Sequence, residues 1–310
     1  MAASFVFAAF VGQNAAFAPR LKRGAVLADV TSANIVGYNT IQVEYHSQTA
    51  FALQFTDVAD EARPLHVTEL VTGVTLKSST TFGTAMDQIW IWSTNVNTWV
   101  KYGYYKPSGG TAEWKRYNAN GTTTAEKWID LTAADVCQPG DSFLFYNGNN
   151  KPTSSHPDGD PGYGKKTITL AGGVRQFKIA TTYTVQYHEQ QFMAYPWPVA
   201  MKVADIAKYN SYNKSSTTFG TAMDQLWRWD VAINTWVKYG YYKPSGGTAA
   251  WTRYNAKGTT TAEKWIALDE TDVVPAGQGF LFYNGNNKPT TSHPEGDEGY
   301  GKKSITFTFE

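Results

Sequence analysis

The sequence contains one segment of 91 residues twice. Residues 78–168 and 215–305 align at a constant offset of 137 without a gap, and 69 of the 91 aligned positions are identical. Four blocks recur letter for letter, namely SSTTFGTAMDQ, TWVKYGYYKPSGGTA, GTTTAEKWI and FLFYNGNNKPT. An internal repeat of this kind indicates that one structural unit is built twice, so any function must suit a protein made of two near-copies.

Each copy carries the pattern of short β-strands. Residues 87–92 and 98–105 are rich in Trp, Tyr and β-branched side chains, and Gly/Pro/Asn-rich loops follow at 106–110 and 147–164. Strands do not alternate with amphipathic helices, which disfavours a parallel sheet. We therefore predict an all-β fold with two tandem, homologous β-sandwich-like domains related by pseudo-symmetry, and we favour a sandwich over a closed barrel. A helical turn or two is expected at 202–209, and the sequence shows no long amphipathic helix.

The duplicated unit extends beyond the well-matched segment. Strand-like residues 40–45 and 51–55 precede the first copy, and diverged equivalents precede the second copy. We therefore predict a first β repeat domain at 29–172 and a second at 173–310.

Residues 1–28 differ in kind from the repeats. An apolar run at 2–11 is too short to span a membrane as a helix. Small residues follow it, then Phe-Ala-Pro at 17–19 and a basic segment without acidic residues at 20–23. This order is typical of a targeting presequence, and a first strand or helix of the fold is the alternative.

Charge and cysteine content bear on the partners and sites to expect. The net charge is +1 and the isoelectric point is about 7.7, so no electrostatic argument favours nucleic acid or an anionic membrane. The single cysteine, Cys137, corresponds to Val274 in the second copy, which predicts a small buried apolar position rather than a reactive thiol. One cysteine permits no intramolecular disulfide.

The loops do not carry a recognisable catalytic motif. His156 and His293 lie in matched loops with nearby carboxylates, which permits a metal site, but Zn²⁺ sites usually recruit more His or Cys, and we favour a solvated turn. Two further pairs of carboxylates are matched between the copies without other support: Asp87 with Asp224, and Glu126 with Glu263. We therefore expect no enzymatic activity, no catalytic or metal site and no cofactor.

One mismatch between the copies falls within a strand, where Ile91 corresponds to Arg228. Residue 91 points to the opposite side of the strand from Trp90 and Trp92. We expect the two Trp side chains to face the core, each burying about 200 Å², and residue 91 to face outward. An outward Ile paired with an outward Arg predicts either neutral drift or a self-assembly interface at Ile91 and Arg228.

Two functional hypotheses remain. Exposed Trp and Tyr on two tandem β-sandwich modules would suit carbohydrate binding, with Trp114 and Trp251 as a matched pair to test. A rigid, near-neutral module without a catalytic set, present twice, instead suits a subunit of a lattice. Contacts that repeat without closing propagate into sheets or tubes. We favour self-assembly over carbohydrate binding.

The paired SSTTFGTAMDQ, TWVKYGYYKPSGG and FLFYNGNNKP blocks, together with the Phe-Ala-Pro leader at 17–19, resemble the diatom pyrenoid shell proteins (PyShell). The resemblance covers the whole architecture and implies a homo-oligomeric lattice one protein thick around the Rubisco-rich pyrenoid. It implies a location in the chloroplast stroma at the pyrenoid periphery and a role in CO₂ fixation, with Rubisco or the pyrenoid matrix as direct or indirect partners. It implies no residue-level site, nucleic-acid partner or membrane span.

Overall fold

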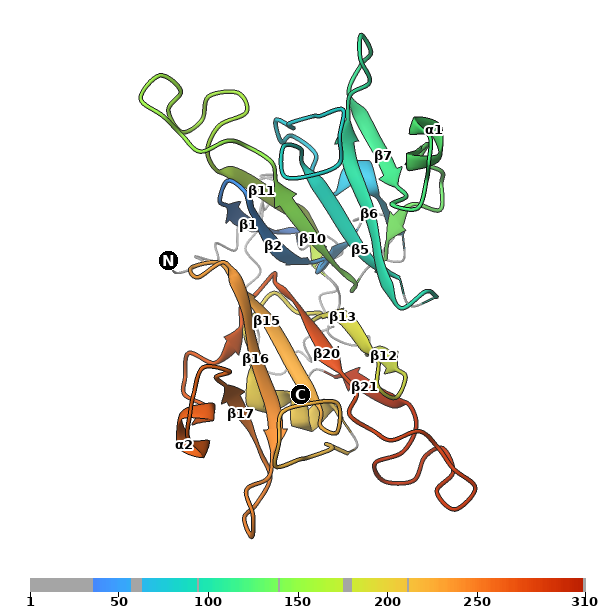
Figure 1. Ribbon diagram of the computed structural model, residues 1–310, viewed down its shortest axis with the longest axis vertical. Coiled ribbons are helices and arrows are strands. Elements are labelled where there is room, and N and C mark those ends of the chain that lie inside the picture. Colours follow the sequence, from blue (N-terminus) through green and yellow to red (C-terminus); the bar gives the residue numbers. More distant parts are fainter. Residues whose placement is uncertain are drawn as a thin grey trace, which may run out of the picture.

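The computed structural model describes residues 36–56, 63–93, 95–138, 140–174, 180–210 and 212–308. The predicted leader at 1–28 lies outside these residues. The protein is nearly all β, with 41% strand and 7% helix, and it contains two six-stranded antiparallel sheets. This confirms the predicted fold class of two tandem, sandwich-like units (Figure 1).

The large sheets of the two halves have the same strand order, as expected for near-identical sequences. The first has the order β2 (Ser47–Ala52), β10 (Ser142–Asn147), β5 (Gln88–Ser93), β6 (Thr98–Tyr105), β7 (Glu113–Tyr117), β8 (Trp128–Ile129). The second has the order β13 (Gln190–Ala194), β20 (Gly279–Tyr283), β15 (Gln225–Asp230), β16 (Thr235–Tyr242), β17 (Ala250–Tyr254), β18 (Trp265–Ala267). No described strand of one half joins a sheet of the other.

Smaller sheets and short helices complete each half. In the first half these are β1 (Val36–Val43), β11 (Lys166–Val174) and β3 (Phe55–Thr56), the pair β4 (Leu65–His66) and β9 (Val136–Cys137), and helices η1 (Val67–Glu69) and α1 (Thr124–Lys127). In the second half these are β12 (Thr181–Val185) with β21 (Lys303–Phe307), β14 (Met201–Lys202) with β19 (Val273–Val274), and helices η2 (Val203–Tyr209) and α2 (Thr261–Lys264). The helix η2 confirms the helical turns predicted at 202–209.

The core of each half lies between its large sheet and its smaller sheets. In the first half Phe143 and Phe145 of β10 contribute from the large sheet, and Ile168 of β11 contributes from the small one; all three are fully buried. Cys137 lies in the same core and is fully buried, as is Val274 in the second half. The prediction of a small buried apolar position is therefore confirmed, and burial raises the pKa of the Cys137 thiol.

The two halves meet face to face near the middle of the long axis. Figure 1 shows them related by an approximate two-fold rotation, with α1 and α2 on opposite sides of the molecule. The long loops after β10 and after β20 project from opposite corners, and the β6–β7 and β16–β17 loops lie at opposite ends of the long axis. Corresponding surfaces of the two halves thus face in opposite directions.

Candidate interaction surfaces

The junction between the halves is a cluster of aromatic and aliphatic side chains. Phe192 of β13 lies at its centre, with its ring in T-shaped contact with Trp99 at 5.1 Å and with Trp236 at 6.4 Å between centroids. The other members come from corresponding strands of both halves: Ala50, Leu144, Leu281, Trp90, Trp92, Trp227 and Trp229. Each large sheet therefore buries one face in its own core and part of its other face against the other half.

This arrangement corrects the predicted orientation of β5 and β15. Ile91 is only 8% exposed and belongs to the core of the first half, whereas Trp90 and Trp92 are half-buried on the opposite face, in the junction cluster. Arg228 occupies the corresponding inward position. Its Nε donates a hydrogen bond to Tyr239 Oη at 3.1 Å, and its guanidinium pairs with Asp230 at 3.2 Å.

Ile91 and Arg228 were candidates for a self-assembly interface because both side chains were expected to face outward. That expectation is wrong, since neither side chain forms part of an outward surface. The difference between Ile91 and Arg228 therefore reflects different packing in the cores of the two halves. Asp230, the carboxylate that pairs with Arg228, corresponds to Ser93 in the first half, where residue 91 is apolar.

Main-chain hydrogen bonds across the junction fix the two halves together. Ala52 N–H donates directly to the Gly277 carbonyl at 2.8 Å. At the corresponding place in the other half, Ala194 N–H donates to Tyr183 Oη at 3.3 Å, and that hydroxyl donates to the Gly140 carbonyl. The same link is thus made directly on one side and through a tyrosine hydroxyl on the other.

The Trp residues of the junction are identical in the two copies, but the segment that leads into β10 differs. Positions 138, 141 and 142 differ between the copies, and they precede or begin β10 where it meets the other half. A Cβ atom added at Gly279 would lie 2.4 Å from Ser142 Oγ, although these two residues occupy equivalent positions. A second residue with a Cβ atom at position 279 would clash with Ser142, so one of the two equivalent positions carries glycine.

Away from the junction, other exposed positions also differ, for example Glu113 from Ala250, but one set of exposed residues is identical in the two copies. We call this set the repeated surface, and each member has a counterpart 137 residues later: Thr80, Thr81, Thr84, Ala85, Lys106, Ser108, Gly109, Thr111, Thr122, Thr123, Thr124, Ala125, Glu126, Lys151 and Thr153. The approximate two-fold rotation places its two copies on opposite sides of the molecule (Figure 1).

The aromatic residues singled out for stacking against sugars are not available for that role. Trp114 is 7% exposed and Trp251 is 6% exposed, and each lies in the core of its own half. The large side chains of the repeat fill cores and the junction, so the tandem carbohydrate-binding hypothesis loses the pair on which its test depended.

The matched histidine loops form exposed turns. The ring of His156 stacks on Tyr163 at 4.5 Å between centroids, and its Nδ1 lies 3.5 Å from Asp160. His293 stacks on Tyr300 in the same way. Among the described residues no group of three or more His, Cys, Asp or Glu side chains is placed to hold a metal ion.

The matched carboxylates have structural contacts. Asp87 is fully buried and accepts hydrogen bonds from Lys166 Nζ at 2.6 Å, from Lys77 N–H at 2.7 Å and from Gly148 N–H at 2.9 Å. Burial raises the pKa of the Asp87 carboxyl, and the ammonium of Lys166 opposes that rise. Glu126 caps the first turn of α1, and hydrogen bonds from Thr122 and Thr123 hold the pKa of its exposed carboxyl at about 2.

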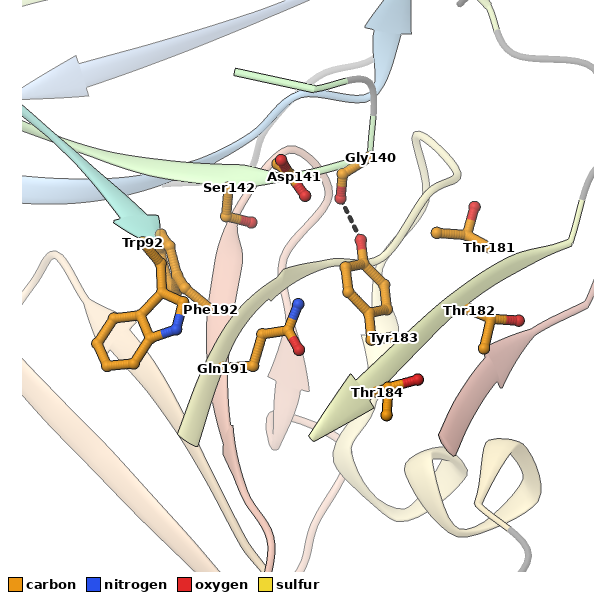
Figure 2. A pocket seen from close by; sticks show the side chains of 10 residues that line it. All are labelled: Trp92, Gly140, Asp141, Ser142, Thr181, Thr182, Tyr183, Thr184, Gln191 and Phe192. Atoms are coloured by element: carbon orange, nitrogen blue, oxygen red, sulfur yellow. Dashed lines mark hydrogen bonds between the residues drawn. The ribbon is translucent and has the colours of Figure 1, made fainter. Parts of the chain in front are cut away.

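A cavity of about 420 Å³ opens beside the junction, between the start of β10 and strands β12 and β13. Figure 2 shows Asp141, Ser142 and Gln191 pointing into the space between these strands, with the indole of Trp92 at one side. Burial raises the pKa of Asp141 to about 6, opposed by one hydrogen bond from Gln138 N–H at 3.2 Å. Sequence reasoning missed this site because its residues come from both halves and differ between the copies.

No described helix has the length and apolar character needed to cross a membrane. Comparison with models of known protein families gives no match, and comparison with curated proteins gives none either.

Proposed function

We propose that the protein is a non-enzymatic structural subunit that assembles with copies of itself into a sheet-like or tubular lattice. The observation that carries the proposal is that both halves present the same set of exposed residues, such as Thr81, Ala85 and Ser108 and their counterparts.

The symmetry of the molecule explains why two identical surfaces favour a lattice. Because the halves are related by an approximate two-fold rotation, the two copies of the repeated surface face in opposite directions (Figure 1). If one neighbouring molecule binds to one copy of the repeated surface, a second neighbour can bind to the other copy in the same way. Contacts of this kind leave an unsatisfied surface on every added molecule, so they propagate rather than close.

The cellular setting follows from the resemblance to diatom pyrenoid shell proteins. The paired blocks and the Phe-Ala-Pro leader support a lattice in the chloroplast stroma at the pyrenoid periphery, enclosing Rubisco and helping CO₂ fixation. Rubisco or the pyrenoid matrix is the proposed direct or indirect partner. A fluorescent fusion that labels a rim around the pyrenoid would support this setting, and diffuse stromal fluorescence would contradict it.

Electron microscopy of the purified protein tests self-assembly itself. We expect ordered sheets or tubes whose abundance rises with protein concentration, with a repeat that reflects one subunit. Discrete particles of one chain at every concentration, verified by light scattering, would overturn the proposal.

A further inference from the structure

The cavity beside the junction is lined by polar side chains without protein partners. Ser142 Oγ and Gln191 Oε1 are shielded from solvent and make no hydrogen bond. Within the described part of the chain, Asp141 Oδ1 and Trp92 Nε1 also make no hydrogen bond, and both belong to residues that line the cavity. Buried polar groups in folded proteins are nearly always hydrogen-bonded, so the two shielded atoms, Ser142 Oγ and Gln191 Oε1, indicate a missing partner, while Asp141 and Trp92 add accessible polar atoms to the same cavity.

The kinds of group present restrict the chemistry of that partner. Asp141 offers carboxylate oxygens, which only accept, whereas the Trp92 indole N–H only donates, and Gln191 offers both. A cation would pair with Asp141 but leave the N–H donors unmatched. An anion would match those donors but would be repelled by the carboxylate. A neutral ligand with several hydroxyl groups donates to the carboxylate and accepts from the N–H groups at the same time.

The volume of the cavity is large enough for a small ring or chain that carries such hydroxyls. Its volume of about 420 Å³ lies within the range of about 300–1,000 Å³ that is typical of small-molecule sites. The indole of Trp92 forms one side, with its nitrogen on the edge turned toward Gln191 (Figure 2). An aromatic wall of this kind packs against the C–H groups of a polyol while its N–H bonds to an oxygen.

The corresponding place in the other half lacks the carboxylate and the serine hydroxyl. Gln278 replaces Asp141, and Gly279 replaces Ser142. By strand register, Gln191 corresponds to Thr49. Gln278 Oε1 and Thr49 Oγ1 are themselves buried without a hydrogen bond, so unpaired polar atoms occur on both sides and only the acidic and hydroxyl groups are particular to one.

We infer that the cavity formed by Trp92, Asp141, Ser142 and Gln191 binds a small, neutral, hydroxyl-rich ligand, either a monosaccharide or an acyclic polyol. The Asp141 carboxylate accepts hydrogen bonds from one or two hydroxyl groups of the ligand. Trp92 Nε1 and Gln191 Nε2 donate hydrogen bonds to ligand oxygens. This site is independent of self-assembly, since it lies beside the junction and uses none of the repeated surface.

Saturation-transfer difference NMR and isothermal titration calorimetry test the inference on the full chain in whatever state of assembly it adopts. The probes are glucose, galactose and mannose for cyclic sugars, glycerol and mannitol for acyclic polyols, and methylammonium and acetate as charged alternatives. We expect saturable binding of at least one sugar or polyol. Comparing the cyclic sugars with the acyclic polyols shows which of the two ligand classes the cavity binds.

Asp141→Asn is expected to weaken that binding about tenfold to a hundredfold, because it removes a charged acceptor. Trp92→Phe, which keeps the ring but removes the N–H, is expected to weaken it as well. Glu270→Gln removes an exposed carboxylate elsewhere and is expected to leave binding unchanged. Near-UV circular dichroism verifies that each variant keeps the native packing.

Three results would overturn the inference. Absence of saturable binding by every sugar and polyol would remove the ligand class, and binding of methylammonium or acetate alone would replace it. Sugar binding that survives both Asp141→Asn and Trp92→Phe in folded protein would place the site elsewhere.

Discussion

Asp141 shows how one residue at the junction affects stability. Its carboxyl has a pKa of about 6 in the folded protein against an ordinary value of 3.8, because burial disfavours the charged form. A carboxyl whose pKa is raised on folding stabilises the fold while protonated, so this contribution is lost as pH rises from about 4 to about 6. The second repeat avoids the cost, since it carries the neutral Gln278 at the equivalent position.

We therefore predict that Asp141→Asn raises the free energy of unfolding above pH 6 by up to about 3 kcal/mol and leaves it nearly unchanged below pH 4. The amide oxygen of Asn can still accept from Gln138 N–H, so the local turn is kept. Urea unfolding of both proteins at about pH 4 and about pH 8 measures the difference. An equal difference at both pH values would contradict the assignment of the effect to this carboxyl.

At the scale of elements, Asp87 joins three segments that the sequence keeps far apart. It lies just before β5 and holds Lys166 at the start of β11, Gly148 at the end of β10 and Lys77 ahead of the strand. Asp224 makes the same three contacts with Lys303, Gly285 and Lys214. The largest cause of the lowered pKa of Lys166 is its burial, so its charge depends on the carboxylate beside it.

Asp87→Asn is predicted to lower the free energy of unfolding of the first half by about 3–5 kcal/mol, because it leaves the buried ammonium of Lys166 unpaired. Asp224→Asn is the matched variant and is predicted to cost the second half a similar amount. Chemical denaturation followed by Trp fluorescence measures both. Asp130→Asn, which removes an exposed carboxylate, serves as the control. A loss below about 1 kcal/mol for either buried variant would show that the Lys–Asp pair is not a main support of the fold.

The sequence predicted which residues form strands better than it predicted which way those strands face. The β6 strand was expected at 98–105 and occupies Thr98–Tyr105, because its β-branched and aromatic residues end at a Pro-Gly loop. The predicted directions of the Trp90 and Ile91 side chains were wrong because both faces of β5 are covered, one by the core and the other by the second half. Alternation cannot distinguish two apolar environments. The cavity beside the junction depends on the same unpredicted contact between halves.

At the scale of the whole molecule, the junction requires a glycine where positions 142 and 279 meet. Gly279→Ala is predicted to destabilise the junction by about 1–3 kcal/mol, because the new methyl group would meet Ser142 Oγ and Cβ. Adding Ser142→Gly to Gly279→Ala removes the two nearest atoms and is predicted to restore part of the loss, since Phe192 Cζ would still lie 2.9 Å from the new methyl group. Thermal unfolding of the two single variants and the double variant measures the coupling. Additive effects of the two substitutions would contradict the close contact between these residues.

The proposed lattice makes a prediction that depends on the molecule having two copies of the repeated surface. Ser108 and Ser245 are exposed in the turns at opposite ends of the long axis, next to glycines with positive φ angles of 74° and 73° at Gly109 and Gly246. The turns need those glycines, but the serine side chains are free to be enlarged. Ser108→Arg and Ser245→Arg therefore add bulk and charge to one end each without disturbing a core.

If these ends carry lattice contacts, either single variant keeps one working end and is expected to form short or sparse assemblies, because it can join a neighbour on one side only. The double variant is expected to remain as single chains, since neither end can add a neighbour. Ala134→Arg, at an exposed position that differs between the copies, is expected to assemble as the unmodified protein does. Electron microscopy and light scattering at matched concentrations compare the four variants with the unmodified protein. Normal assembly of the double variant would exclude these ends from the contact and confine it to the rest of the repeated surface, around Ala85, Ala125 and Lys151 and their counterparts.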